Sequence, residues 1–453
     1  MSRLVSSCLC GDLYTSYELV MKFYSTNNKN HRVDLRTAVI QGLAPDNGLY
    51  MPEHIPVLDQ SLIQSLPDLS FQQIGFEVAR AMLGNDLPET QLQKIVEHTL
   101  AFDSPLVEVE SNVFSLELFH GPTLAFKDFG ARFLAGLLGY FAKEQDREIT
   151  ILVATSGDTG SAVANAFLNV PGTRVVVLYP SGKVSVAQEK QFTTLGGNIT
   201  ALEVNGTFDD CQRLVKQAFL DADLKQKFFL TSANSINIAR LIPQSFYYFR
   251  AYAQLKTKKD VVFAVPSGNF GNLTAGLLAK RMGLPIANFV AATNANDVVP
   301  EYLKTEKFYP RPSVQTISNA MDVGNPSNFV RMLDLFQHDF KSLTELITGF
   351  TFTDAETREA MLQLYDSTGY IMDPHGAVGY LGLKQFLKSK PDYTGIFLET
   401  AHPAKFADVV EATLETKVEL PERLQKFMRG EKKTVIVSAG FDEFREVISE
   451  LLG

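Results

Sequence analysis

The sequence predicts an α/β protein with two units of parallel sheet and a separate N-terminal subdomain. Apolar runs of strand length recur along the chain, and a helical pattern follows most of them. The runs are hydrophobic throughout, as is typical of strands that helices cover on both faces. Alternation of strands and helices favours parallel sheets with right-handed crossovers. A chain of 453 residues is long enough for two or three domains.

The predicted elements follow one another along the chain. We expect strands at residues 113–118, 149–154, 175–179, 199–204, 261–265, 289–292, 396–398 and 434–437. Val, Ile and Phe are abundant in these runs, which favours strands over loops. Helical patterns cover residues 129–141, 161–168, 187–195, 208–219, 235–255, 272–282, 355–365 and 405–414.

This order divides the chain into three parts. We predict an N-terminal leader with a subdomain at residues 1–100 and a smaller α/β domain at residues 126–249. A larger α/β domain is expected to combine residues 101–125 with residues 250–453. The N-terminal part has proline-punctuated helices instead of the alternation. Residues 301–352 also break the alternation, so we expect an insertion there in the larger domain.

Composition excludes several classes of protein. The net charge of −9 argues against a surface for nucleic acid or for an anionic membrane. No apolar run approaches the roughly 20 residues that would span a bilayer. Three cysteines, Cys8, Cys10 and Cys211, give neither a disulfide framework nor a complete metal site. We therefore expect no metal, and a reducing cytoplasmic setting fits best.

Lys127 stands at the junction of a predicted strand and a predicted helix. A Gly-Pro-Thr turn follows strand 113–118, and the run then continues as Leu-Ala-Phe-Lys-Asp-Phe-Gly into the helix. A lysine there can point into a cleft, and loss of solvation among aromatic side chains lowers its pKa. A neutral amine can attack an aldehyde and form a Schiff base. Lys127 is therefore a candidate catalytic residue; the alternative is a surface lysine that begins a helix.

Two further loops have the composition of anion sites. Residues 266–272 read Pro-Ser-Gly-Asn-Phe-Gly-Asn between a strand and a helix, where backbone N–H groups and the helix N-terminus can bind a phosphate. The alternative is a tight strand–helix turn without a ligand. Residues 155–160, Thr-Ser-Gly-Asp-Thr-Gly, also lie between a strand and a helix, and their hydroxyl and amide groups suit a carboxylate.

These runs, with the run Glu-Thr-Ala-His-Pro-Ala-Lys at residues 399–405, carry a family resemblance. In this order they resemble threonine synthase, a pyridoxal-phosphate (PLP) enzyme related to the tryptophan synthase β family. The resemblance runs from about Met21 to the C-terminus. It implies the two-domain PLP-dependent β-family fold, with the cofactor in the cleft between the domains. Because residues 1–20 lack both this resemblance and a targeting pattern, we expect a tail there, or else an extra helix.

The resemblance also implies roles for individual residues. PLP is expected on Lys127, with its phosphate in the loop formed by Gly268, Asn269, Phe270, Gly271 and Asn272, and with the Thr400 hydroxyl at its ring nitrogen. The substrate carboxylate is expected at the loop that contains Thr155, Ser156, Asp158 and Thr159. Substrate phosphate is expected at Asn234, Ser235 and Arg240; the alternative for these is a surface arginine behind an N-cap serine.

The role of Asp158 is open. Many relatives carry Asn at this position, facing the PLP 3′-oxygen, and an ionised carboxylate there would repel a phenolate. Asp158 is therefore protonated, turned away, or hydrogen-bonded to another group, and a simple helix cap is a further alternative. His402 is expected to be structural.

The implied reaction converts O-phospho-L-homoserine and water to L-threonine and phosphate, by γ-elimination and β-addition of water. The alternatives are a PLP-dependent phospho-lyase that releases 2-oxobutyrate and a non-catalytic PLP-binding protein. We expect a small-molecule substrate, no nucleic-acid or membrane partner, and a monomer or homodimer.

Overall fold

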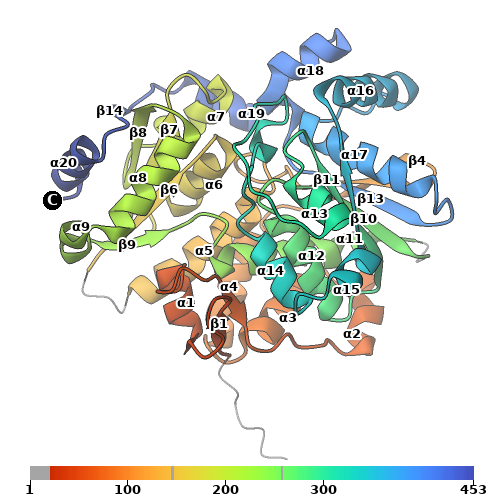
Figure 1. Ribbon diagram of the computed structural model, residues 1–453, viewed down its shortest axis with the longest axis horizontal. Coiled ribbons are helices and arrows are strands. Elements are labelled where there is room, and N and C mark those ends of the chain that lie inside the picture. The colour runs from red at the N-terminus through yellow and green to blue at the C-terminus, as the bar shows by residue number, and fades with distance from the viewer. Residues whose placement is uncertain (1–20, 144–146, 257–258) are drawn as a thin grey trace, which may run out of the picture.

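The computed structural model describes residues 21–143, 147–256 and 259–453. The predicted leader, residues 1–20, lies outside the described residues. The described chain forms three sheets, one in the N-terminal subdomain and one in each of two α/β units (Figure 1). The α/β fold with an N-terminal subdomain is thereby confirmed, since both larger sheets are parallel apart from one edge strand.

The larger unit contains a six-stranded sheet. Its strands, in spatial order, are β12 (Ile347–Thr351), β11 (Ile286–Thr293), β10 (Val261–Pro266), β13 (Thr394–Glu399), β5 (Val113–Glu117) and β4 (Leu106–Glu110). Only β4 pairs in the antiparallel direction. Strand β12 falls within the insertion predicted at 301–352, so the end of that prediction is wrong. Its short sequence, Ile-Thr-Gly-Phe-Thr, has a glycine at its centre and lacks a continuous apolar run.

The smaller unit contains a five-stranded parallel sheet. Its order is β14 (Val435–Ser438), β8 (Ile199–Asn205), β7 (Thr173–Pro180), β6 (Ile149–Ala154) and β9 (Phe229–Ser232). The strand expected at 434–437 is present, but it pairs with β8. The assignment of the whole of 250–453 to the larger domain is therefore wrong at the C-terminus. The exposed Val435 and Ile436 mark β14 as an edge strand, and the sequence does not specify which sheet such a strand joins.

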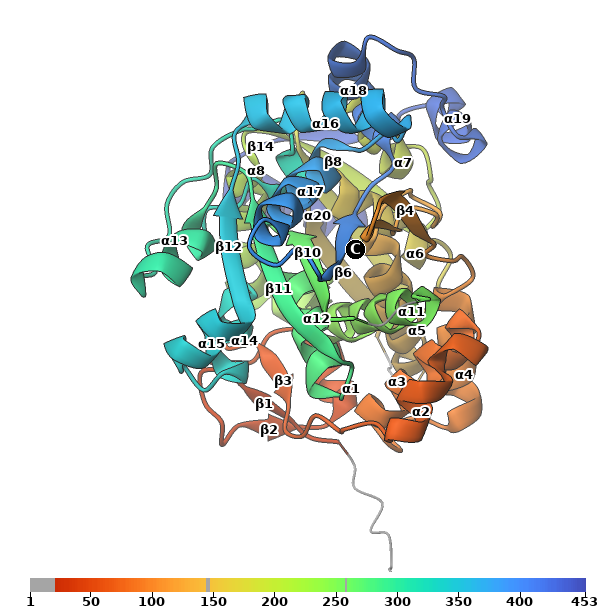
Figure 2. The same ribbon diagram turned by 90° about the vertical axis from the view of Figure 1, so that its right-hand side faces the viewer.

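Helices cover both faces of each larger sheet. Along β10, Val262 and Ala264 pack in the same apolar cluster as helix α17 (Pro374–Leu387), whereas Val261 and Phe263 pack on the opposite face. The same alternation occurs on β7. Continuous hydrophobic runs are therefore required, because the side chains on both faces leave water. Figure 2 shows the helices on the two sides of the six-stranded sheet.

The remaining helices of the two units follow the strands in order. Those of the smaller unit are α5 (Lys127–Ala142), α6 (Asp158–Phe167), α7 (Val186–Thr193), α8 (Phe208–Leu220), α9 (Ala222–Lys227) and α20 (Phe441–Leu452). Those of the larger unit are α12 (Gly271–Arg281), α13 (Val298–Thr305), η3 (Asn319–Met321), α14 (Phe329–Leu335), α15 (Phe340–Leu346), α16 (Asp354–Thr368), η4 (Pro403–Phe406) and α18 (Ala407–Leu414). Helix α19 (Glu422–Arg429) then packs on α7 of the smaller unit.

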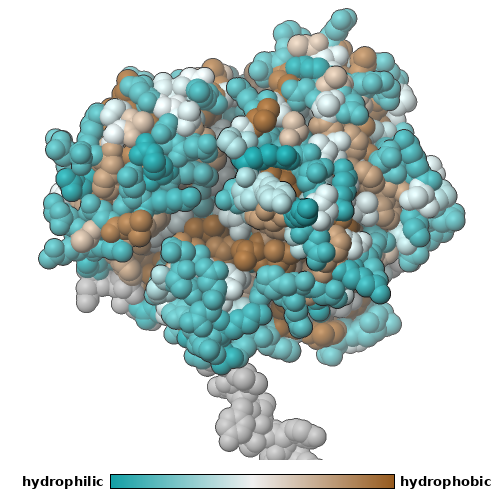
Figure 3. Space-filling view, in the orientation of Figure 1, coloured by the Kyte–Doolittle hydropathy of each residue, from teal (hydrophilic) through white to brown (hydrophobic). Residues whose placement is uncertain are grey.

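The N-terminal subdomain packs beneath both units (Figure 1). It consists of β1 (Phe23–Ser25), β2 (Arg32–Val33), β3 (Tyr50–Pro52), α1 (Leu35–Gln41), α2 (Gln60–Ser65), η1 (Leu66–Asp68), α3 (Phe71–Leu83) and α4 (Glu89–Thr99). Viewed from outside, apolar side chains gather near the middle of the face between this subdomain and the smaller unit (Figure 3).

The helix predicted at 235–255 is broken in the structure. It divides into α10 (Ile238–Leu241), a 3-10 turn η2 (Ile242–Ser245) and α11 (Phe246–Gln254). Pro243 has no N–H to donate, so the helical ladder cannot pass through it unchanged. The side chain of Asn237 accepts a hydrogen bond from the N–H of Ala239 and begins the first piece. Residues 233–237, between β9 and α10, form a loop.

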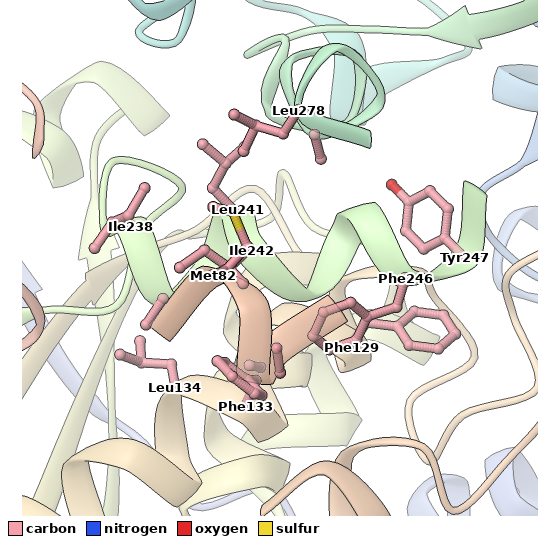
Figure 4. Packing of buried hydrophobic residues seen from close by; sticks show 14 of the residues in the cluster. Met82, Phe129, Phe133, Leu134, Ile238, Leu241, Ile242, Phe246, Tyr247 and Leu278 are labelled. Carbon is pink, nitrogen blue, oxygen red and sulfur yellow. The ribbon is translucent and has the colours of Figure 1, made fainter. Parts of the chain in front are cut away.

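An apolar core fixes the position of helix α5. Phe129 and Phe133 from α5 pack with Phe246 from α11 and with Met82 from α3, and all four side chains are buried (Figure 4). The helix start at Lys127 is therefore held by the N-terminal subdomain and by the broken helix together. Burial of such side chains stabilises a fold by about 1.5–3 kcal/mol each.

Candidate active site

One cavity between the two units collects every residue that the sequence proposed for the site. It is bordered by the carboxyl ends of β6, β10 and β13 and by the N-termini of α5, α6 and α12. The proposed residues in its lining are Lys127, Thr155, Ser156, Asp158, Thr159, Asn234, Ser235, Arg240, Gly268, Asn269, Phe270, Gly271, Asn272 and Thr400. Parallel strands place their carboxyl ends at one edge, so loops far apart in sequence meet there.

Lys127 lies beside Thr400 because their two segments are paired. The N–H of Phe126 donates to the carbonyl of Thr400 at 2.9 Å, and the N–H of His402 donates to the carbonyl of Leu124 at 3.0 Å. The side chain of Lys127 is only 16% exposed, which contradicts the surface-lysine alternative. Burial lowers the pKa of the Lys127 ammonium, and the nearby Asp158 carboxylate opposes that effect.

The turn before Lys127 is fixed by one carboxyl group. Asp128 accepts hydrogen bonds from the N–H of Thr123 at 2.8 Å and from its hydroxyl at 2.6 Å. Leu124 has a φ of 59°, in the left-handed region that side chains other than glycine rarely adopt. Residue 121 must be a glycine, because the Cβ of any other residue would lie 2.4 Å from Oδ2 of Asp128. The turn therefore aims Lys127 into the cavity.

The Asp158 carboxylate is bonded to two side chains, those of Lys405 and Gln188. Its Oδ1 lies 2.7 Å from Nζ of Lys405 and accepts a bond from Gln188 at 2.9 Å, and its Oδ2 lies 3.8 Å from Nζ of Lys127. Burial opposes ionisation of Asp158, but the two lysines outweigh it and hold its pKa below the ordinary range. These contacts favour the alternative in which Asp158 is ionised and hydrogen-bonded to other groups. The helix-cap alternative is wrong, because Gly157 is the N-cap residue of α6.

Lys405 ends the run 399–405 that carries the family resemblance, but nothing in the sequence assigned it a role; in the structure it pairs with Asp158 behind the cavity lining. Its ammonium is fully buried and also donates to the carbonyl of Thr123 at 2.9 Å. In the sequence it reads as a lysine near a helix start, which is a common surface position. Only its spatial neighbours distinguish it, and these come from distant parts of the chain.

The glycine loop connects β10 to α12. Phe270 has a φ of 59°, and a Cβ on Gly268 would lie 2.9 Å from the Cα of Met321. The side chain of Asn272 donates to the carbonyl of Pro266 at 2.8 Å and accepts from the hydroxyl of Ser267. Asn272 therefore closes the loop with its side chain. The first turn of α12 faces the cavity, and such N–H groups attract an anion.

Arg240 is buried, in contrast to the surface alternative. It is 3% exposed, its Nη1 donates to the carbonyl of Ala233 at 2.5 Å, and its buried Nε has no hydrogen-bond partner within the described chain. Burial lowers its pKa to about 10, so it stays a cation at neutral pH. The alternative of Ser235 as a helix cap is wrong, since Asn237 caps α10. Asn234 is held by a bond to the carbonyl of Ala154 at 3.3 Å.

His375 and the loop at residues 319–323 also line the cavity. The N–H of Ala320 donates to Nε2 of His375 at 3.1 Å, and Nδ1 of His375 contacts Asp373. Nε2 is thereby an acceptor, so the proton of a neutral ring is on Nδ1. Residues 319–328 resemble a family signature in the sequence, but nothing in the run identifies a role for His375 some 50 positions later.

His402 has a structural contact, as expected. Its Nδ1 accepts a hydrogen bond from the N–H of Ala404 at 3.1 Å and so begins the turn η4. Burial lowers its pKa to about 4, so the ring is neutral at physiological pH. In the part of the chain that the structure describes, no helix is long and apolar enough to cross a bilayer.

Three family models match successive parts of the chain. A model described as pyridoxal-phosphate dependent enzyme matches residues 99–396, which is more than half of the chain. A model of the threonine synthase N terminus matches residues 22–100, and a model of the threonine synthase C-terminal region matches residues 376–448.

Named relatives and solved structures agree with these models. The chain is 51% identical over 408 residues to a threonine synthase of Haemophilus influenzae, covering 90% of this chain and 94% of the relative. It superposes on the crystal structure of threonine synthase from Escherichia coli with a TM-score of 0.90 at 45% identity, over 95% of this chain and all of the other. A PLP-bound threonine synthase from Brucella melitensis gives a TM-score of 0.88 at 33% identity, over 95% of this chain and 99% of the other. The chain therefore belongs to the threonine synthase family of pyridoxal-phosphate-dependent enzymes.

Proposed function

We propose that this enzyme converts O-phospho-L-homoserine and water to L-threonine and phosphate. The observation that carries the proposal is the meeting of Lys127, two anion-binding loops and Arg240 in one cavity. A substrate with an amine, a carboxylate and a phosphate requires several such sites at fixed separations. The similarity of the chain to threonine synthases over nine-tenths of its length supports this substrate.

The residues of the cavity fit PLP. Lys127 would hold its aldehyde carbon, the first turn of α12 would hold its phosphate, and the Thr400 hydroxyl would meet its ring nitrogen. A hydroxyl at that nitrogen, unlike a carboxylate, leaves it largely neutral. When bound, PLP supplies an electron sink that makes the α-carbon of an attached amino acid acidic.

We propose that Arg240 selects the substrate phosphate. It is a buried cation whose Nε lacks a partner, and an anion in the cavity would compensate the cost of burying its charge. A guanidinium also matches the geometry of a phosphoryl group. Asn234 and Ser235 would add polar contacts, since both line the same cavity.

The substrate carboxylate would lie at the loop that begins α6. The side chains of Ser156 and Thr159 line the cavity, and the N-terminus of α6 adds positive potential. Thr155 has a different contact, because its hydroxyl accepts hydrogen bonds from the N–H groups of Gly157 and Gly160 at 2.9 and 2.8 Å. Thr155 would therefore shape the loop and leave the carboxylate to its neighbours.

Lys127 would move the protons of the reaction. Its amine would remove the proton at Cα and later one at Cβ, and phosphate would leave from Cγ. A proton would then return to Cγ, water would add at Cβ, and a proton would return to Cα. One lysine can serve both as the covalent anchor and as the general base, because the substrate amine frees it before a proton must move. Its buried position supports this use, since a desolvated amine gives up its proton more readily.

A product assay tests the function. The purified protein is incubated with O-phosphohomoserine, and phosphate, threonine and 2-oxobutyrate are measured together. We expect equal amounts of phosphate and threonine, and no turnover in Lys127→Ala. Phosphate with 2-oxobutyrate and little threonine would favour the phospho-lyase, and bound PLP without any product would favour a non-catalytic protein.

The cellular compartment and the oligomeric state are two further proposals. We propose that the enzyme works in the cytoplasm, since three cysteines in 453 residues suit a reducing compartment. A monomer or homodimer stays a prediction, which sedimentation of the purified protein tests.

A further inference from the structure

We propose that Lys405 is a positioning residue that holds the Asp158 carboxylate in a buried ion pair and so keeps Asp158 from locking the Lys127 ammonium in its charged form. The inference rests on the proposed role of Lys127 as a base that must become neutral.

Geometry carries the first step. Lys405 approaches Asp158 at 2.7 Å, whereas Lys127 is 3.8 Å from the same carboxyl group. The Lys405 side chain is fully buried, and a second hydrogen bond, from its ammonium to the carbonyl of Thr123 at 2.9 Å, fixes its position. Gln188 donates a further hydrogen bond to Asp158. The carboxylate is therefore satisfied by partners other than Lys127.

The charges around Lys127 come from four elements. Asp158 on α6 and Asp373 before α17 favour the charged amine, whereas Lys405 on η4 and Arg240 on α10 favour the neutral one. Burial of Lys127 itself is the largest influence and lowers its pKa. Lys405 belongs to the pair that offsets the carboxylates, and it is the cation that contacts Asp158 directly.

Without Lys405, Asp158 would have one cation left to pair with. A carboxylate within about 4–6 Å raises the pKa of an amine by about 1–3 units. Lys127 would then be held as an ammonium ion, which can neither bond to an aldehyde nor accept a proton. In this account Lys405 leaves the chemistry to Lys127 and sets the pH at which that amine is available.

The test measures the ionisation of Lys127 directly. The full-length protein, stripped of cofactor, is labelled with a trace of acetic anhydride across a pH series, and mass spectrometry follows the peptide that contains Lys127. The pH at which labelling of Lys127 is half-maximal is the Lys127 midpoint. We expect this midpoint to rise by about one pH unit or more in Lys405→Met relative to the unchanged protein. Lys280→Met is the matched control, since Lys280 is a partly buried lysine at the end of α12 and bonds to the carbonyl of Ile286. Its midpoint should stay in place.

Further variants keep the test decisive if Lys405→Met does not fold. Asp158→Asn should lower the Lys127 midpoint, and adding Lys405→Met to that variant should raise it by less than Lys405→Met does alone, because no carboxylate is left for Lys405 to hold. Lys405→Arg, which keeps the charge, should lie near the unchanged protein. The proposal would be overturned if Lys405→Met left the Lys127 midpoint unmoved, or moved it equally in both backgrounds. A raised midpoint in Lys405→Arg would overturn it as well.

The labelling result is independent of turnover. A raised midpoint in a protein that makes no threonine would support the ion-pair account and reject the proposed function. Threonine formation with an unmoved midpoint would reject the ion-pair account alone. As a second readout, the pH at which the visible absorbance of the PLP-loaded enzyme changes should move in the same direction in Lys405→Met.

Discussion

The guanidinium of Arg331 donates a hydrogen bond to the carbonyl of Tyr50 at 2.9 Å, which ties α14 to a strand of the N-terminal subdomain. The same buried side chain donates to the carbonyl of Ile236 and to Oδ1 of Asn328, both at 2.7 Å. One cation therefore joins the subdomain, the larger unit and the loop that carries Ser235. The loop proposed for the substrate phosphate is held from behind by this contact.

Replacing Arg331 should weaken the fold. Arg331→Met leaves buried carbonyl groups without donors, at about 1–3 kcal/mol for each group, so we expect a loss of about 3–5 kcal/mol in the free energy of unfolding. Denaturant unfolding measures this loss. Arg213→Met is the control, because Arg213 is exposed on α8 and surface pairs contribute little. Equal stability of the two variants would contradict the role given to Arg331.

Arg240→Ala should reduce affinity for O-phosphohomoserine and keep the cofactor. Loss of a charge-assisted contact costs about 1.5–3 kcal/mol, which is roughly a ten- to hundred-fold loss of affinity. Arg240→Lys should recover part of it, because an ammonium cannot form the bidentate contact. Substrate titration followed by the PLP absorbance measures both effects. Arg250→Ala, which loses an ion pair to Asp103, should bind substrate normally; an equal affinity in Arg240→Ala would place the phosphate elsewhere.

The buried carboxyl group of Glu399 should make the stability of the protein depend on pH. Burial raises its pKa well above the ordinary value, and the neighbouring Asp373 carboxylate adds to this effect. In the unfolded chain, Glu399 ionises near its usual pKa, whereas in the folded protein it stays protonated to a higher pH. Below the usual pKa, Glu399 is protonated in both states and destabilises neither. As the pH rises from the usual pKa toward the folded pKa, the unfolded chain gains stability by losing the proton, so the folded protein becomes relatively less stable. Glu399→Gln cannot ionise and should escape this loss.

The comparison of Glu399→Gln with the unchanged protein should therefore vary with pH. Its relative stability should increase as the pH rises above the ordinary glutamate pKa of about 4, by at most about 1.4 kcal/mol for each pH unit. Thermal unfolding across a pH series measures the difference. Glu422→Gln is the control, since the Glu422 side chain is 82% exposed. A constant difference between Glu399→Gln and the unchanged protein would contradict the assignment of Glu399 as a neutral acid.

Borohydride should attach the cofactor to a single lysine. The purified protein should be yellow, and reduction followed by peptide mapping should find PLP on the peptide that contains Lys127. The reason is the buried position of Lys127 in the cavity, next to Thr400. Fixation on Lys405 or on any surface lysine would exclude Lys127 as the anchor.

The parallel sheets and the site loops could be predicted because local patterns specify them. Buried strands such as β6 and β10 require continuous apolar residues, and the carboxyl ends of such strands gather the loops at residues 155–160 and 266–272. The two loops therefore follow from strand position without a tertiary model. The chemical roles within them stay predictions.

The partners of buried charges could not be predicted, because they lie far apart in the sequence. Lys405 and Asp158 are separated by almost 250 positions, and nothing near either residue identifies the other. The same holds for Arg331 and Tyr50. Edge strand β14 joins the smaller sheet because Val437 and Phe444 pack in the apolar cluster of that unit. This packing is tertiary and is not encoded in the local sequence of β14. Local propensity specifies elements, whereas burial specifies which elements meet.

The fate of oxygen atoms tests the proposed reaction most directly. Turnover of O-phosphohomoserine is carried out in water enriched in heavy oxygen, and mass spectrometry examines both products. Because phosphate leaves by cleavage of the bond between carbon and oxygen and water adds at Cβ, we predict one heavy oxygen in the threonine hydroxyl and none in the released phosphate. Heavy oxygen in the phosphate, with homoserine as the other product, would show simple phosphate hydrolysis and contradict the function proposed for Lys127 and Arg240.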